Sequence, residues 1–230
     1  MSGRTLVGVA FSGGLDSSTL AVCARKHSKV AAFGASAEGS HDEQRLQEAA
    51  DLLGVELSIV NLSAEELVGD LDRMKLPFSA TLMDQSLWCL YSAVARRAAS
   101  KGVEVILLGQ LADELFGGYR KYLTAISDYG EERAQEMMDR DLLQYQERGK
   151  IRDMNAFEGL VGAELPYASS EVLEVARRTP MEFKIRGGER KVILRRAAEI
   201  LGVPPGIASA PKKAAQYSTG IQKLVSRMTL

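Results

Sequence analysis

Residues 12–18, Ser-Gly-Gly-Leu-Asp-Ser-Ser, combine glycines, hydroxyls and a carboxylate in a pattern suited to phosphate chemistry. An apolar run over residues 6–11, predicted as a buried strand, precedes them, and a predicted helix over residues 19–26 follows. Glycines in such a turn let backbone N–H groups approach an anion, and the helix N-terminus adds partial positive charge. The segment therefore predicts a phosphate-binding loop. The alternative is a glycine turn in which Asp16 and Ser17 only cap a helix.

Asp16 indicates that a cation accompanies the phosphate. The P-loop template ends in Gly-Lys-Ser/Thr, whereas this loop has no lysine and has a carboxylate in the first helical turn. A carboxylate repels phosphates unless a divalent cation bridges the two groups, so the loop predicts Mg²⁺.

A second segment with suitable chemistry, residues 109–119, follows an apolar run over residues 103–108. Ligands of parallel sheets lie at the carboxyl ends of the strands, so Asp113 is predicted to lie opposite Asp16 across the Mg²⁺. Two carboxylates around one cation also offset the charge of a departing pyrophosphate. The alternative is that Asp113 and Glu114 only begin a capped helix.

Strand and helix patterns alternate over the first half of the chain. Strands are predicted over residues 6–11, 29–35, 55–62 and 103–108, and helical patterns between them include residues 41–54 and 84–100. The alternation predicts right-handed crossovers and an α/β fold whose doubly wound parallel sheet is covered on both faces.

The second half of the chain has a different pattern. After about Tyr119 strand signals disappear, and helices are predicted over residues 131–148, 169–178, 187–201 and 216–228. We therefore expect an α/β core over residues 1–120 and a mostly helical part over residues 121–230 packed on it, as one continuous domain.

The composition is that of an ordinary soluble globular protein, with 230 residues, of which 46% are hydrophobic and 26% charged. The formal net charge of −1 argues against a broad nucleic-acid or anionic-membrane footprint. With two histidines and no CxxC, a zinc site is not indicated, and Cys23 and Cys89 are expected to be buried, reduced thiols. No signal peptide or membrane span is recognised, so we expect a cytoplasmic protein, with a homodimer as the default assembly.

The first loop resembles the pyrophosphate loop of the N-type ATP pyrophosphatases, which include asparagine, GMP, NAD and argininosuccinate synthetases, β-lactam synthetase and tRNA-thiolating enzymes. The resemblance implies an adenine nucleotide alpha hydrolase-like fold and cleavage of ATP between its α and β phosphates. It does not distinguish among the members.

The second segment narrows the resemblance. Residues 113–119, Asp-Glu-Leu-Phe-Gly-Gly-Tyr, are similar to the signature of the synthetase domain of asparagine synthetase, which β-lactam synthetase shares. In the family's order, residues 165–167 then resemble its Val-Pro-Phe, residues 179–195 its helix-start lysine segment, and residues 210–213 its Arg-Pro-Lys. The resemblance covers nearly the whole chain.

This resemblance implies an AMP-forming ligase that uses ATP and Mg²⁺. A substrate carboxylate attacks the α-phosphate to form an acyl-adenylate with release of pyrophosphate, and ammonia then displaces AMP to leave an amide. If the substrate is aspartate, the product is asparagine.

The site residues implied by the resemblance come from all parts of the chain. Asp16 and Asp113 match the metal-linked acids, Lys212 the lysine that meets the leaving pyrophosphate, and Lys191 a second lysine within reach of the phosphates. Lys212 and Lys213 have the alternative of being a solvated basic pair. The remaining matches are the pyrophosphate loop, the end of the second strand beside the adenine, and a glycine near the α-phosphate or ribose: Ser12, Gly13, Gly14, Ser17 and Ser18; Ala32 or Phe33; and Gly109.

The sequence departs from the family pattern at three places. Gln110 replaces a glutamate assigned to proton handling in the amide-forming step, and glutamine cannot take up a proton at neutral pH. Ser169 and Glu164 replace an acid and an arginine that help shape the amino-acid pocket, which puts aspartate in doubt as the substrate. Ser2 follows Met1 where the family's full enzymes have a glutaminase domain, so we expect ammonia from solution or from a separate glutaminase subunit.

Two other functions stay open. One is adenylation of another group, such as a tRNA base, which the lack of a CxxC and of a basic surplus weakens. The other is a nucleotide-binding regulatory subunit without turnover, which Gln110 keeps open.

Overall fold

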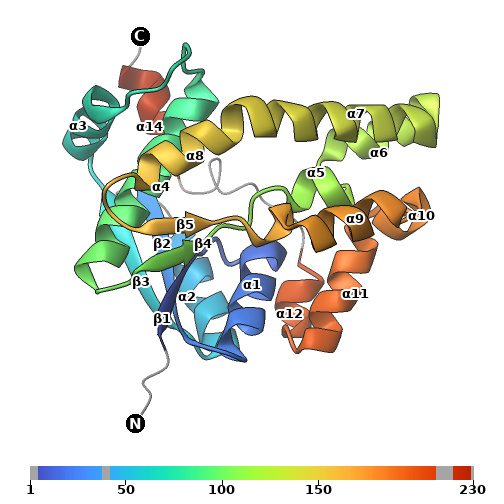
Figure 1. Cartoon of the computed structure of the whole chain (residues 1–230), viewed down its shortest axis with the longest axis horizontal. Helices are drawn as coiled ribbons and strands as arrows, with labels where there is room; N and C mark the ends of the chain where they lie inside the picture. The colour runs from blue at the N-terminus through green and yellow to red at the C-terminus, as the bar shows by residue number, and fades with distance from the viewer. Residues whose placement is uncertain (1–4, 38–41, 211–219, 229–230) are drawn as a thin grey trace.

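A five-stranded sheet forms the centre of the protein (Figure 1). The computed structural model describes residues 5–37, 42–210 and 220–228. All strand pairings in this sheet are parallel, and the order is β3-β2-β1-β4-β5. The predicted parallel α/β sheet is therefore confirmed, with strands β1 Leu6–Ala10, β2 Lys29–Ala37, β3 Glu56–Leu62, β4 Val105–Leu107 and β5 Gly162–Glu164.

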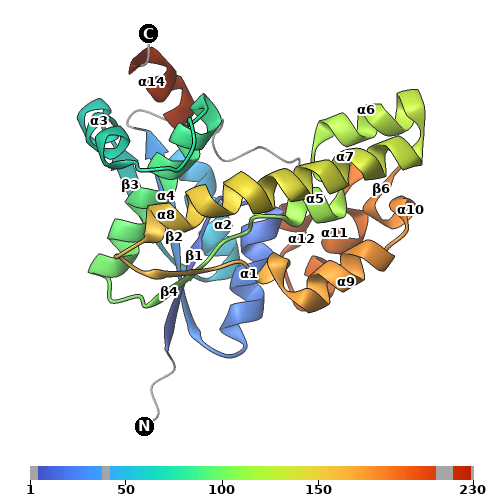
Figure 2. The same cartoon turned by 45° about the horizontal axis from the view of Figure 1, so that its top comes forward.

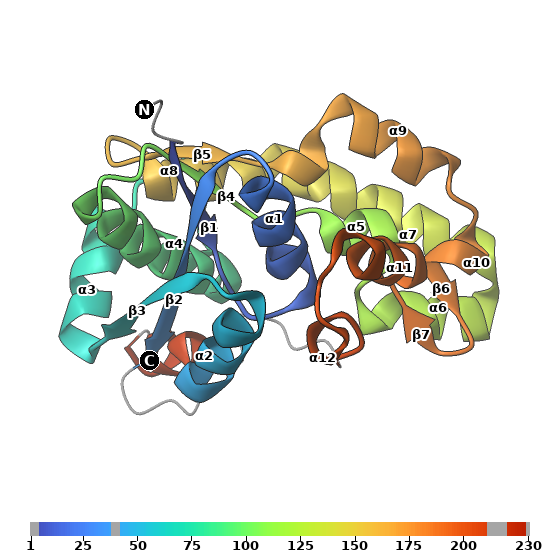
Figure 3. The same cartoon turned by 90° about the horizontal axis from the view of Figure 1, so that it is seen from below.

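Helices cover both faces of this sheet (Figure 3). Helices α1 (Leu15–Arg25) and α2 (Asp42–Leu53) lie on one face and share a core cluster with Ala32. Helices α3 (Ala64–Arg73) and α4 (Leu82–Ser100) lie on the other, where Phe33 packs with Trp88. Because successive side chains of a strand point to opposite faces, a sheet covered on both sides needs apolar residues throughout.

The strand order reverses beside β1, which lies between β2 and β4. The chain passes from β1 through β2 to β3 in one direction, and then returns through α4 to place β4 on the other side of β1. Ligands of open α/β sheets bind at the carboxyl ends of the strands where the order reverses. The loops after β1 and β4, the two segments singled out in the sequence, meet at this point.

Strand β5 corrects the expectation that strand signals end near Tyr119. Its three residues pair with β4, and the backbone N–H of Gly162 donates to the carbonyl of Glu104 at 2.8 Å. A Cβ at Gly162 would lie 3.1 Å from that carbonyl oxygen, so glycine suits the approach. The second half of the chain thus completes the sheet of the first half.

A long helical run extends across the molecule from α4 to α6 (Arg120–Tyr129), as Figure 2 shows. Helix α5 (Ala112–Phe116) and helix α6 precede it. The run consists of α7 (Glu131–Gln144), a π-helical turn η1 (Tyr145–Gly149) and α8 (Lys150–Phe157), and α8 contacts α4. The sequence predicted a helix over residues 131–148 but not the turn or the continuation.

The remaining elements cover the other side of α1 and the end of α4. Helix α11 (Val192–Leu201) contacts α1, α5 and α12 (Pro205–Ala208), whereas α14 (Ile221–Met228) contacts α4, α3 and β2. The helix predicted over residues 187–201 begins only at Val192, because residues 185–190 form a short antiparallel hairpin whose turn glycines have φ of +57° and +83°. The bounds are η2 Pro166–Ala168, α9 Ser170–Arg178, α10 Met181–Lys184, β6 Ile185–Arg186, β7 Glu189–Arg190, α11 Val192–Leu201, α12 Pro205–Ala208 and α14 Ile221–Met228.

Both cysteines are free thiols, as expected. Cys89 is fully buried, and mainly for this reason its pKa is raised to about 12. Cys23 is only partly buried, contrary to the expectation, although burial also raises its pKa. Among the described helices, none is long and apolar enough to cross a membrane.

Candidate active site

The loop after β1 is folded around its serines. The backbone N–H of Ser12 donates to Ser17 Oγ at 3.2 Å, and the Ser17 hydroxyl donates to the carbonyl of Gly14 at 3.3 Å. Gly13 has φ +68°, the left-handed conformation that glycine adopts without strain. The chain therefore turns tightly from β1 into α1, whose first turn contains Asp16.

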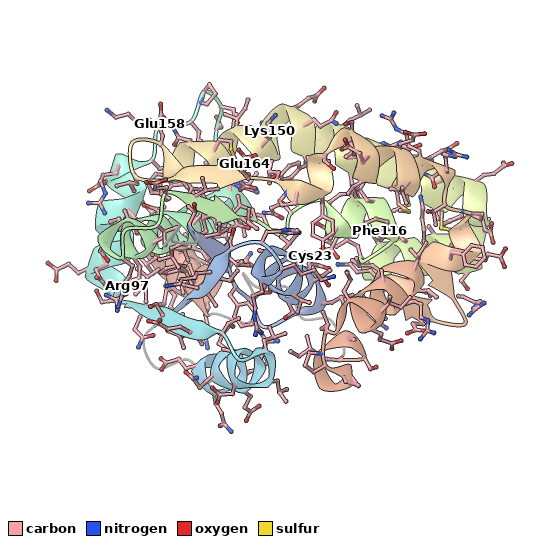
Figure 4. The ribbon with its side chains drawn as sticks, turned by 60° about the horizontal axis from the view of Figure 1, so that its bottom comes forward. Cys23, Arg97, Phe116, Lys150, Glu158 and Glu164 are labelled. Carbon is pink, nitrogen blue, oxygen red and sulfur yellow. The ribbon has the colours of Figure 1, made fainter. Side chains whose placement is uncertain are left out.

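Two contacts from distant segments hold this loop in place. Tyr167, in the segment matched to the family's Val-Pro-Phe, donates its hydroxyl to the carbonyl of Asp16 at 3.1 Å. At Gly109, directly after β4, a Cβ would lie 3.3 Å from Asp16 Cβ, so the absence of a side chain allows the two loops to approach. The rings of Phe116 and Tyr167 form a T-shaped pair with their centroids 6.4 Å apart; Figure 4 labels Phe116 on α5 and Cys23 on α1.

Lys191 joins the two predicted acids. Its Nζ lies 2.6 Å from Asp16 Oδ1, 2.7 Å from Asp16 Oδ2 and 2.6 Å from Asp113 Oδ1. The lysine side chain is 4% exposed, whereas those of Asp16 and Asp113 are 22% and 18% exposed. Burial alone would lower the pKa of Lys191, but the carboxylates of Asp113 and Asp16 outweigh it and raise that pKa. A buried ammonium therefore lies between two carboxylates that reach solvent.

Backbone strain and close packing surround this ion cluster. Leu111 and Lys191 are the described non-glycine residues with positive φ, at +73° and +60°, and both lie at the site. Such conformations cost free energy and concentrate at functional sites. A Cβ on Gly118 would lie 1.8 Å from Asp113 Oδ1 and 2.3 Å from Lys191 Cε, so only glycine fits there.

The two carboxylates fit a divalent cation held together with a nucleotide. They already converge on one cationic group, the ammonium of Lys191. Within the described ranges no group of three or more histidine, cysteine or acidic side chains could hold a metal alone. Mg²⁺ is commonly held by one or two carboxylates together with substrate phosphates and water. Asp16 and Asp113 would be the protein ligands of such an ion.

A cavity of about 1020 Å³ opens beside this cluster. One part of it lies along the loops after β1 and β4 and the start of α2, where its lining includes Phe11, Ser12, Asp16, Ser17, Arg45 and Gly109. The other part lies between α4 and the π-helical turn, where its lining includes Leu87, Leu90, Tyr91, Gln110, Tyr145 and Arg152. Asp16 and Asp113 of the ion cluster therefore line the cavity, whereas Lys191 does not.

Comparison with known proteins decides the family. The family model described as asparagine synthase matches residues 1–158 and 122–228. The chain belongs to the asparagine synthase family. A putative glutamine-hydrolysing asparagine synthetase 1 of Methanocaldococcus jannaschii is 26% identical over 98% of this chain and 48% of its own length. Asparagine synthetase 1 of Bacillus subtilis is 35% identical over 53% of this chain and 19% of its own length.

The chain spans less than half the length of each of these two relatives. Among solved structures, NMN synthetase from Francisella tularensis is similar over 99% of this chain and 78% of its own, with a TM-score of 0.48 and 12% identity.

Within this asparagine synthase-family chain, most predicted residues of the first loop lie at the site. Ser12, Asp16 and Ser17 line the cavity, and Gly13 and Gly14 form the turn between them. Ser18 is fully buried, is not among the lining residues, and its Oγ has no hydrogen-bond partner among the described residues. The loop thus presents two hydroxyls rather than three.

The structure places the two residues predicted beside the adenine on opposite faces of the sheet. Strand β2 continues to Ala37, so Ala32 and Phe33 lie within the strand and not at its end as expected. Phe33 lines the cavity together with Ala35, whereas Ala32 is fully buried on the other face. Gly109, Gln110 and Asp113 line the cavity, and Lys212 falls outside the described residues.

Ser169 and Glu164, the two departures from the family pattern that were predicted at the amino-acid pocket, lie outside the cavity. The Ser169 hydroxyl accepts a hydrogen bond from the backbone of Val172 at 3.4 Å and caps α9, and Glu164, labelled in Figure 4, is an exposed residue of β5. Neither residue lines the cavity.

Sequence reasoning missed the residues of the far wall. On α4, Leu87, Leu90, Tyr91 and Val94 line the cavity with the spacing of one helix face, a pattern present in the sequence but attributable to any core helix. Tyr145 lies near the end of the helix predicted over residues 131–148, and Arg152 lies beyond that prediction. No motif marked them.

Proposed function

We propose that this chain is an AMP-forming, ATP-dependent ligase that adenylates a carboxylate with release of pyrophosphate and then transfers the acyl group to ammonia to form an amide. The observation that carries the proposal is the convergence of Asp16 and Asp113 on Lys191 at the point where the strand order reverses. Membership of the asparagine synthase family supports it, and the names of the relatives suggest asparagine as one possible product.

The proposed chemistry assigns a task to each group. The backbone of residues 12–18 and the Ser17 hydroxyl bind the β- and γ-phosphates that leave as pyrophosphate. Mg²⁺, when bound, neutralises charge on those phosphates and on the departing pyrophosphate. Lys191 holds Asp16 and Asp113 in place from the buried side, because its ammonium contacts both carboxylates.

The cavity supports a second substrate beside the nucleotide. Its volume of about 1020 Å³ is at the upper limit of the range of roughly 300–1,000 Å³ for ligand pockets. The far part combines apolar residues of α4 with Tyr91, Gln110 and Arg152. We propose that the acid substrate binds there, with its carboxylate directed toward the α-phosphate. We also propose that the chain works in the cytoplasm, where ATP, ammonia and a separate glutaminase would be available to it.

The test follows both products of ATP cleavage. The purified chain is incubated with Mg-ATP, ammonium chloride and either aspartate or members of a panel of other amino acids and small carboxylic acids, and pyrophosphate and AMP are measured. We expect release of both with one acid, and a decrease of roughly 10²–10³-fold in Asp16→Asn.

The matched control is Asp72→Asn, which removes an exposed carboxylate of α3 and should leave the rate unchanged. Release of ADP in place of AMP would contradict the proposal.

A second candidate is a nucleotide-binding subunit without turnover, and Gln110 is the observation that favours it, because glutamine cannot accept the proton released in amide formation. Saturable binding of Mg-ATP without pyrophosphate release for any acid would support this candidate.

A further inference from the structure

Gln110 lies beside a carboxyl group that the sequence did not single out. Gln110 lines the cavity together with Tyr91 of α4, and its side chain is close enough to Asp153 of α8 to lower the pKa of that carboxyl group. Asp153 is 0% exposed and accepts hydrogen bonds from Arg152 Nε at 2.7 Å and from the Tyr145 hydroxyl at 2.8 Å. Gln110, which cannot accept a proton, therefore lies near a buried carboxyl group on α8 that can.

The π-helical turn connects this carboxyl group with the cavity. Tyr145 begins the turn and lines the cavity, whereas Asp153 does not. A Cβ on Gly149, at the end of the turn, would lie 2.5 Å from Tyr145 Cδ2, so the tyrosine ring packs directly on glycine backbone. Such turns are rare and often occur at functional sites. Here the turn lets one side chain contact both the cavity and the buried Asp153.

We propose that Tyr145 and Asp153 form a proton relay that takes the place of a carboxylate at position 110 in amide formation. This inference rests on the proposed function and deepens it. Tyr145 is the group that meets the attacking amine, Asp153 is the terminal acceptor, and Gln110 positions Asp153 through its amide.

The proton relay accounts for each bond and each proton in the proposed amide-forming step. The lone pair of ammonia forms the new C–N bond, and the electron pair of the acyl C–O bond leaves with AMP. The nitrogen then gives up one proton to Tyr145 Oη while the tyrosine passes its own hydroxyl proton to Asp153 Oδ2. After product release the same transfers in reverse return the proton to water in the cavity.

The surroundings of Asp153 suit it to receive a proton. Burial raises its pKa above the ordinary value, and the hydrogen bonds and charge of Arg152, the Tyr145 hydroxyl and Gln110 only partly offset this effect. Arg152 is shared, because its Nη1 also donates to Asp84 at 3.1 Å. Burial raises the pKa of Tyr145 well above its ordinary range, so the tyrosine transfers a proton but does not hold a charge.

The experiment separates the two half-reactions. Acid-dependent exchange between ATP and radiolabelled pyrophosphate reports adenylation, and amide formed from ammonium chloride reports the second step, with the acid found active above. We expect Tyr145→Phe and Asp153→Asn to keep exchange within about threefold and to lose roughly 10²–10⁴-fold in amide formation. Adding Gln110→Glu to Tyr145→Phe should restore amide formation, because it returns a carboxylate to the cavity wall.

The matched control is Tyr122→Phe, which also removes a tyrosine hydroxyl bonded to an aspartate, but from a residue that does not line the cavity. It should change neither rate. Amide formation by Tyr145→Phe at the parent rate, or an equal loss of both half-reactions without rescue by Gln110→Glu, would overturn the relay alone. Absence of acid-dependent exchange in the unaltered chain would overturn the proposed function and the relay with it.

Discussion

At the scale of single residues, the ammonium of Lys191 keeps two like charges close together. Asp16 and Asp113 each lie 2.6 Å from its Nζ, and two carboxylates so near one another would repel strongly without an intervening cation. Removing one partner of a buried ion pair leaves an uncompensated charge, which costs more than the pair contributes. The cluster therefore holds both acids in position before a nucleotide arrives.

Gly118 tests how closely this cluster must be packed. In Gly118→Ala the new Cβ would lie 1.8 Å from Asp113 Oδ1, so the carboxylate and Lys191 must shift. A displacement of about 1 Å can cost roughly 10²-fold in rate, and overpacking costs about 1–3 kcal/mol of stability. We expect both effects, measured as pyrophosphate release and as free energy of unfolding in urea.

Gly69→Ala in α3 is the matched control. The nearest heavy atom to its new Cβ is the flexible Arg73 guanidinium at 3.7 Å. Replacing a glycine within a helix should leave the rate unchanged and add about 0.5–1 kcal/mol of stability. A Gly118→Ala variant as active as the parent would show that the Asp113–Lys191 geometry is not needed.

At the scale of elements, the start of α4 connects the sheet with the helical run. Thr81 and Asp84 form a capping box, and Asp84 also accepts a hydrogen bond from Arg152 of α8 at 3.1 Å. Burial alone would raise the pKa of Asp84, but the Thr81 hydrogen bonds and Arg152 outweigh it and hold the pKa below its ordinary value of 3.8.

This lowered pKa fixes the sign of a pH dependence. A carboxyl group whose pKa is lower in the folded state stabilises the fold above its unfolded pKa and loses that contribution as the pH falls through the folded pKa. Asp84→Asn should therefore lower the free energy of unfolding by about 1–3 kcal/mol at pH 7. The difference from the parent should shrink below about pH 4. Equal differences at pH 7 and pH 3 in urea titrations would contradict this assignment.

Elements also mark how far the sequence could predict the site. The loops after β1 and β4 were predictable because each lies between an apolar strand and a helix start, a local pattern. The contact of Lys191 with Asp16 joins residues 175 positions apart and follows only from the packing of α11 on α1. The positions of Tyr145 and Asp153 depend on a π-helical turn that no residue pattern predicts. Strand β5 has three residues, too few to show the alternation of apolar and polar residues that is typical of a strand.

At the scale of the whole molecule, the last described helix packs into the same core as the sheet. Ile221 of α14 is 0% exposed and belongs to the cluster that contains Phe33 of β2 and Trp88 of α4. Figure 1 shows α14 beside α3 and α4, far from α9 to α12, which immediately precede it in the described chain. A mutation in the core-facing side of α14 should therefore lower the stability of the sheet as well as that of the helix.

Ile221→Ala tests this coupling. Removing a buried isoleucine side chain costs about 2–5 kcal/mol, because apolar contacts are lost and a cavity is left. The chain has a single tryptophan, Trp88, whose indole donates to Asn155 at 2.8 Å, so its fluorescence reports the α4–α8 contact directly. We expect fluorescence and far-ultraviolet circular dichroism to shift to lower urea together. Ile200→Ala, at a side chain 73% exposed on α11, should stay within about 0.5 kcal/mol of the parent. A Trp88 transition that stays at the parent midpoint in Ile221→Ala would show that α14 unfolds independently of the sheet it covers.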